Sequence, residues 1–284
     1  MVPEKFHDLI IVENNRVFID VAYHGCGSGC KYCYVLSSSE EQLLASYEDL
    51  EKMVWYLSVN HILDNRIVSF CPNTEPFKTR ESAERVLFII RKIKENQCYI
   101  QISTKEYIDY NILLELEKLA GDNIIFINVS MPFLNISEIE PGAASIKRRV
   151  KNIENVAWCT HLKCGLYIKP FTKSAFNNLH WYIEIINKIL PDYVCIGIAF
   201  DKKAKIPCTS LYHQEDAEEV IAIQKNMLRE FALQIESITN CRVVYSSICA
   251  ISQIAQIGCT LDLGRYEKGF CKGCVFTKNK VIVL

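Results

Sequence analysis

The sequence lacks three features that would place it in a specialised class of protein. It has no run of about 20 uninterrupted apolar residues, the length that a membrane-spanning helix needs. Its net charge is only −1, so its composition offers no electrostatic argument for binding nucleic acid. No basic segment followed by a long apolar run stands at its start, so we expect no secretory signal.

Apolar residues and cysteine are what the chain has in quantity. Hydrophobic residues make up 50% of the 284 positions and charged residues 23%, which excludes a disordered chain. The 14 cysteines are expected to stay reduced in the cytoplasm, with some of them bound to metal. Five stand singly in or beside apolar runs and are expected in the core: Cys71, Cys98, Cys159, Cys164 and Cys195.

Strand-like and helix-like segments alternate over the first 200 residues. The expected strands are rich in Val, Ile, Phe and Tyr, as in a parallel sheet buried on both faces: 16–23, 66–71, 98–103, 123–130, 163–169 and 193–200. Amphipathic helices are expected between them: one opened by Ser39 with Gln42 in a capping box, then 80–95, a third through Leu113 and Leu116, one from Ser145, and 175–190.

Six β/α units in order predict an α/β fold. Because parallel strands need helical crossovers, residues 1–200 are expected to form a partial (β/α)6 TIM-like barrel, open on one side. Functional residues are then expected just after the strands. Residues 201–284 begin with a polar connector and predict a helix at about 214–237 and a strand at 242–246. We expect them to form a small cysteine-rich C-terminal module.

Three cysteines follow the first strand within eight residues: Cys26, Cys30 and Cys33. The glycines between them permit tight curvature and leave backbone N–H groups to face sulfide. A zinc site would need a fourth ligand nearby, whereas three ligands on a cubane cluster leave one iron open to a small molecule. The pattern therefore favours a reactive iron–sulfur cluster, with a zinc knuckle as the alternative.

Residues 24–34, His-Gly-Cys-Gly-Ser-Gly-Cys-Lys-Tyr-Cys-Tyr, resemble the radical S-adenosylmethionine superfamily, and most of all its spore photoproduct lyase-like branch. The resemblance implies a [4Fe–4S] cluster on Cys26, Cys30 and Cys33, with Tyr32 beside the cofactor. The fourth iron would bind the amino and carboxylate groups of S-adenosylmethionine. Reductive cleavage of that cofactor would form a 5′-deoxyadenosyl radical, which abstracts hydrogen from the substrate.

The same resemblance implies cofactor contacts at later strand ends. Glu75, in Cys-Pro-Asn-Thr-Glu-Pro, stands in place of a Gly-Gly-Glu-type segment that receives the methionine amino group. Lys105 would contact the carboxylate of the cofactor, and Arg149, after Glu-Pro-Gly, would support it. The full set implied is Tyr32, Asn73, Thr74, Glu75, Ser103, Lys105, Ser130 and Arg149. The alternatives are structural: a turn at 71–76, a solvated lysine, a turn serine and a surface arginine.

A second group of cysteines stands near the end of the chain: Cys249, Cys259, Cys271 and Cys274. The last two form a Cys-x2-Cys turn, which in intracellular chains is usually a metal knuckle. We expect an auxiliary [4Fe–4S] cluster here. Structural zinc is one alternative, and a redox dithiol of the last two cysteines is another. Cys208 and Cys241 are alternates for the fourth ligand.

The charge balance bears on the substrate and the partners. A duplex-binding protein normally presents a basic face with many phosphate contacts, so a small-molecule or peptide substrate is favoured. Nucleic-acid repair of the lyase-like kind is the alternative, and a non-catalytic iron–sulfur electron-transfer protein is a third hypothesis. The chemistry implies a reducing electron donor such as flavodoxin or ferredoxin, and no membrane partner is expected.

Overall fold

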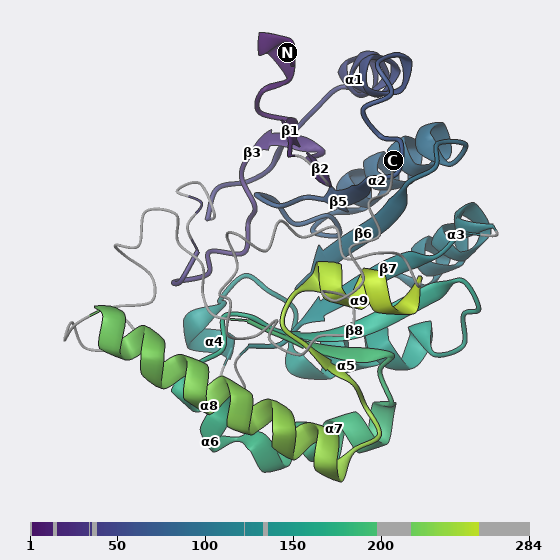
Figure 1. Cartoon of the computed structure of the whole chain (residues 1–284). Helices are drawn as coiled ribbons and strands as arrows, with labels where there is room; N and C mark the ends of the chain where they lie inside the picture. The colour runs from purple at the N-terminus through teal and green to yellow at the C-terminus, as the bar shows by residue number, and fades with distance from the viewer. Residues whose placement is uncertain are drawn as a thin grey trace.

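The computed structural model describes residues 2–13, 16–33, 35, 39–121, 123–132, 136–197 and 217–255. Its main sheet has eight strands in an open order (Figure 1). From one edge to the other these are β1 Ile10–Val12, β2 Arg16–Ile19, β5 Ile67–Phe70, β6 Tyr99–Thr104, β7 Ile125–Ser130, β8 Leu162–Ile168, β9 Tyr193–Ile196 and β10 Val243–Val244. β1 is antiparallel to β2, and every other neighbouring pair is parallel. A separate pair joins β3 Ala22–His24 to β4 Leu43–Leu44.

Helices connect the parallel strands. After a short 3-10 helix at Glu4–Phe6 they are α1 Tyr47–Val59, α2 Arg80–Ile93, α3 Tyr110–Ala120, α4 Ile136–Ile139, α5 Ile146–Val156, α6 Lys173–Asn177, α7 Leu179–Ile189, α8 Ala217–Ile238 and α9 Ser247–Ile254. The expected start of α5 is confirmed, because the Ser145 side chain accepts a hydrogen bond from the Arg148 backbone N–H. No described helix has both the length and the apolar character to cross a membrane.

The α/β fold expected from the sequence is confirmed: the six strands predicted in residues 1–200 are present, and the strand predicted at 242–246 is β10, parallel to β9. Three details of the prediction were wrong. The predicted strand 16–23 is divided between β2 and β3, because residues 22–24 pair with β4 in a separate sheet. The first helix begins at Tyr47 with Ser46 as its cap, because Leu43–Leu44 pairs with β3. The predicted helix 175–190 is two helices, α6 and α7, which meet at Asn178.

The two faces of the sheet pack against different partners. On the outer face, alternate strand residues such as Val68, Ile102 and Ile127 join one large core with the connecting helices. On the inner face, Ile67, Phe126 and Tyr193 form a second, smaller core with side chains of α9. α9 crosses in front of the strands near β7 and β8 in Figure 1, and α8 packs beside α6 and α7.

The described C-terminal residues therefore contribute to the barrel itself. β10 extends the sheet next to β9, and α9 covers part of its inner face. Arg16, at the start of β2, donates a hydrogen bond from Nη2 to the Ser247 hydroxyl of α9 over 3.3 Å. This contact joins the two ends of the open barrel. The predicted boundary between residues 200 and 201 lies outside the described residues.

Candidate cofactor site

The candidate site lies at the carboxyl ends of the parallel strands, where the loops after β5, β6 and β7 meet. Residues 25–33, called here the cysteine loop, pack against these loops. Two backbone hydrogen bonds hold it there, from Lys31 N–H to the Ile139 carbonyl at 2.9 Å and from Gly142 N–H to the Ser28 carbonyl at 3.0 Å.

Glycine is required at two places in this packing. Gly25 has a φ of +80°, and a Cβ there would lie 2.1 Å from the Glu41 carbonyl oxygen. Gly142 approaches the cysteine loop so closely that a Cβ on it would lie 2.3 Å from the Gly27 carbonyl oxygen. Because both obstacles are backbone atoms, a side chain at either position would displace the loop.

The three thiols of the cysteine loop form no disulfide. Cys30 is buried and the other two, Cys26 and Cys33, are half-buried. Burial raises the pKa of Cys30 to about 12 and also raises the pKa of Cys26, so these thiols stay protonated until a cation displaces their protons. No three Cys, His, Asp or Glu side chains of the described ranges lie close enough together to hold a single metal ion.

The donor set suits a cubane cluster. Three thiols lie on one glycine-rich loop, and in a [4Fe–4S] cluster each thiolate binds a different iron, so the sulfur atoms need not converge on one point. The negative charges of Cys26 and Cys30 interact favourably with Lys105, which would offset part of the charge of three thiolates.

Lys105 is the cation of the site. Its ammonium nitrogen lies 5.7 Å from the centroid of the Tyr32 ring. Burial alone would lower the pKa of Lys105, but nearby acidic groups, Cys30 and Glu140 foremost, outweigh burial and raise this pKa above its usual value. Lys105 is therefore a charged, half-buried group within the site and not the solvated surface lysine that the sequence also allowed.

Glu75 joins the loop after β5 to the end of β6. Glu75 is 4% exposed, and its carboxylate accepts hydrogen bonds from the Thr104 hydroxyl and, at 2.9 Å, from the Lys105 backbone N–H. Burial raises the pKa of Glu75, and these hydrogen bonds oppose that rise. The acidic residue that the sequence singled out is thus held at the same strand edge as Lys105.

Asp20 is a site residue that sequence reasoning missed. It directly follows β2, is 2% exposed, and accepts hydrogen bonds from the Thr74 hydroxyl at 2.7 Å and the Asn73 side-chain amide at 3.1 Å. Burial raises its pKa to about 7 against the effect of these hydrogen bonds. Two predicted cofactor ligands, Asn73 and Thr74, therefore point at Asp20. The available signal was a lone acid in the apolar run Arg-Val-Phe-Ile-Asp-Val-Ala-Tyr.

Arg149 is fully buried rather than at the surface. Its Nη1 forms an ion pair with Glu140 at 2.7 Å and donates to the Ser130 carbonyl at 2.8 Å. The other carboxylate oxygen of Glu140 accepts a hydrogen bond from the Tyr32 hydroxyl. Within the described residues the Arg149 Nη2 makes no hydrogen bond. The structure thus places Arg149 behind Glu140 and Tyr32, beneath the cysteine loop.

The two predicted serines have different surroundings. Ser103 is half-buried, and its hydroxyl accepts a hydrogen bond from the Asn128 side chain at 3.1 Å. The side-chain Oδ1 of Asn128 in turn accepts from the Tyr193 hydroxyl at 2.6 Å. Ser130 is buried at the end of β7. Asn128 and Tyr193 escaped the sequence analysis because they lie inside apolar strands, where nothing local marks their side chains as paired.

The predicted C-terminal metal ligands are placed only in part. Cys249 lies half-buried on α9, next to the inner-face core. Cys259, Cys271 and Cys274 lie outside the described residues, as does the alternate Cys208.

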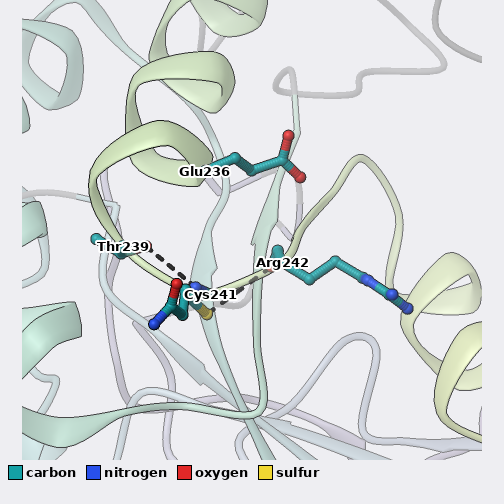
Figure 2. A pocket seen from close by; sticks show the side chains of 5 residues that line it. Glu236, Thr239, Cys241 and Arg242 are labelled. Atoms are coloured by element: carbon teal, nitrogen blue, oxygen red, sulfur yellow. Dashed lines mark hydrogen bonds between the residues drawn. The ribbon is translucent and has the colours of Figure 1, made fainter.

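The other alternate, Cys241, lies in a shallow pocket at the end of α8. Figure 2 shows it between Thr239 and Arg242, with Glu236 above them in this view. Its thiol donates to the Pro191 carbonyl at 3.4 Å, and burial raises its pKa to about 12. This pocket lies just before β10 and so at the amino edge of the sheet, opposite the cysteine loop.

Comparison with known proteins addresses the fold. No model of a protein family matches the chain, and no curated protein matches it. Among solved structures, a variant of spore photoproduct lyase with bound S-adenosylmethionine and dinucleoside spore photoproduct matches with a TM-score of 0.59 and 15% identity. The match covers 81% of this chain and 76% of that chain. This chain has the fold of spore photoproduct lyase.

SuiB of Streptococcus suis, solved with S-adenosylmethionine, shares the fold as well. It matches with a TM-score of 0.54 and 14% identity, over 89% of this chain and 55% of that chain. The resemblance to the lyase-like branch of the radical S-adenosylmethionine superfamily, drawn from the cysteine loop, is thus confirmed at the level of the fold.

Proposed function

We propose that this protein is a radical S-adenosylmethionine enzyme, with a [4Fe–4S] cluster on Cys26, Cys30 and Cys33. The supporting observation is the cysteine loop itself: three thiols without a disulfide, packed at the carboxyl edge of a partial barrel beside Glu75 and Lys105. The same fold binds S-adenosylmethionine in a spore photoproduct lyase variant and in SuiB.

The bound cluster and cofactor would supply one chemical capability: a one-electron reductive cleavage that yields methionine and a 5′-deoxyadenosyl radical, which abstracts hydrogen from substrate. The chain's own residues would prepare the site. Lys105 offers a fixed positive charge for a carboxylate, and Glu75 offers an acceptor for an ammonium group. Burial of Cys30 and Glu75 keeps bulk water away from the reacting groups.

The substrate that fits the charge balance is a small molecule or a peptide. A net charge of −1 gives little of the long-range attraction that duplex binding requires. A nucleic-acid substrate is the second candidate, because the matching lyase structure holds a dinucleoside spore photoproduct. Low-salt binding of a labelled oligonucleotide distinguishes the two: retardation that weakens as salt rises favours nucleic acid, and none at low salt removes it.

Three further parts belong to the proposal. The C-terminal cysteines, with Cys249 as their described member, would hold an auxiliary [4Fe–4S] cluster, with zinc as the alternative. A low-potential donor such as flavodoxin or ferredoxin would supply the electron. A cluster with an open iron requires a reducing compartment, which agrees with a cytoplasmic location.

The decisive experiment is cofactor cleavage. Protein reconstituted anaerobically with iron and sulfide, then given dithionite and S-adenosylmethionine, is expected to release 5′-deoxyadenosine. The triple variant with Cys26, Cys30 and Cys33 replaced by alanine is expected to release none. Cys98→Ala is the matched control, because Cys98 is a buried cysteine just before β6, at the opposite edge of the sheet. A cluster-loaded wild type that forms no 5′-deoxyadenosine would refute the proposal.

A further inference from the structure

We infer that Asp20 is a positioning residue whose carboxylate holds the turn of residues 71–76 in the shape that brings Glu75 to the cofactor site. The contacts of Asp20 stand independently of the enzyme's activity. The consequence for Glu75 rests on the proposed function.

The side-chain donors to the Asp20 carboxylate come from this one turn. Asp20 is 2% exposed. One oxygen accepts from the Thr74 hydroxyl and the other from the Asn73 side-chain amide. The backbone N–H groups of the same two residues also stabilise its negative charge. Two successive residues thus supply both side-chain hydrogen bonds to one carboxylate, one to each oxygen. Hydrogen bonds to the Asp20 carboxylate therefore fix the conformation of the turn.

The turn needs such support. Cys71, its first residue, has a φ of +55°, a left-handed conformation that is unfavourable for a non-glycine residue. Pro72 and Pro76 lack a backbone N–H, so neither can donate a backbone hydrogen bond within the turn. The resemblance to a Gly-Gly-Glu-type segment thus departs from the family pattern at residues whose side chains, Asn73 and Thr74, supply donors to Asp20.

The position of Glu75 follows from that of its neighbours. Its backbone carbonyl accepts from the Gln42 side chain at 2.8 Å, and its carboxylate lies between the Thr104 hydroxyl and the Lys105 N–H. Asp20 touches neither of these groups and acts on the residues just before Glu75. Without Asp20 the turn could rotate about Cys71 and withdraw Glu75 from the end of β6.

The first test uses the metal-free chain. Hydrogen exchange of a peptide that covers residues 71–78 is compared in the wild type, Asp20→Asn and Asp20→Ala. We expect Asp20→Ala to exchange the amides of this peptide about tenfold faster, as the loss of buried hydrogen bonds would cause. Asp192→Asn is the matched control: Asp192 also accepts a backbone N–H, that of Cys164 at 2.7 Å, but at the amino edge of the sheet. Unchanged exchange in both Asp20 variants would overturn the inference. If Asp20→Ala does not fold, Asp20→Asn, which keeps the size of the side chain, decides the test.

The second test uses the cluster-loaded enzyme. Because Asp20 acts through Glu75, Asp20→Asn is expected to raise the KM for S-adenosylmethionine about tenfold while kcat changes less, and to weaken calorimetric binding by the same factor. A general structural defect would lower kcat and the folded fraction together. Faster exchange in the turn with unchanged cofactor binding would overturn the link to Glu75. A wild type that neither binds nor cleaves the cofactor would refute the proposed function and leave the exchange result standing.

Discussion

Replacing Arg149 with methionine removes the cation from an ion pair with no exposed surface on either partner. The Glu140 carboxylate would keep the Tyr32 hydroxyl as a donor but would lose its counter-charge in a place that water does not reach. The carbonyl oxygens of Ser130 and Ala144 would lose the donors Nη1 and Nε of Arg149. Breaking a buried ion pair from one side costs about 3–5 kcal/mol. We expect Arg149→Met to lose this much of its free energy of unfolding.

A double-mutant cycle separates the ion pair from the other losses. Glu140→Gln keeps the size of the side chain and removes its charge. The losses in free energy of unfolding of the two single variants, added together, are expected to exceed the loss of the double variant by about 2 kcal/mol. The reason is that in the double variant no charge stays buried without a partner. Urea denaturation of the metal-free chain, followed by circular dichroism, measures all four states.

The surface pair of Arg80 and Glu84 supplies the control. Both side chains are well exposed, and a pair of this kind contributes about 0.5 kcal/mol, so Arg80→Met is expected to cost no more than that. Two results would refute the buried ion pair as a stabilising contact beneath the cysteine loop. One is a loss below about 1 kcal/mol for Arg149→Met, and the other is a double-variant loss equal to the sum of the two single-variant losses.

Three further predictions concern the site. Because the folded pKa of Asp20, about 7, lies above its ordinary value of 3.8, the folded chain binds a proton more tightly between these values. Its free energy of unfolding is expected to fall by up to about 4 kcal/mol as the pH rises from 4 to 7. Denaturation at several pH values measures this slope. Glu75, whose pKa burial also raises, adds a slope of the same sign, so Asp20→Asn is expected to make the fall shallower, and an equally steep fall in that variant would contradict the assignment. Gly142→Ala places a Cβ 2.3 Å from the Gly27 carbonyl oxygen and is expected to lower iron incorporation several-fold. Gly197→Ala is not expected to lower iron incorporation, because its Cβ would meet only the flexible Lys169 side chain. Equal iron content in the two variants would contradict the close packing at Gly142. If the auxiliary cluster exists, metal analysis of the triple variant of Cys26, Cys30 and Cys33 is expected to find about four irons per chain. Zinc without iron in this variant would instead indicate a zinc site.

Sequence reasoning succeeded where the signal was local. The apolar runs that became β6 and β7 were located to within two residues, because period and composition act over a few neighbouring positions. The start of a helix near Ser145 was located for the same reason. Ser39 and Gln42 also fit a capping box, but the pairing of Leu43–Leu44 with β3 overrode it. A long-range contact of this kind leaves no trace in the local pattern.

The amino-acid sequence by itself determined the order of the β/α units and the placement of three thiols on one short loop, because both are properties of spacing along the chain. Only the tertiary structure decided where the polar side chains of the site point. Asn73 and Thr74 face Asp20 across 53 and 54 positions of sequence. Arg149 turns inward to Glu140 instead of lying at the surface. Charge and hydrogen-bonding capacity belong to the residue, but its partner and its burial depend on which distant segments pack around it.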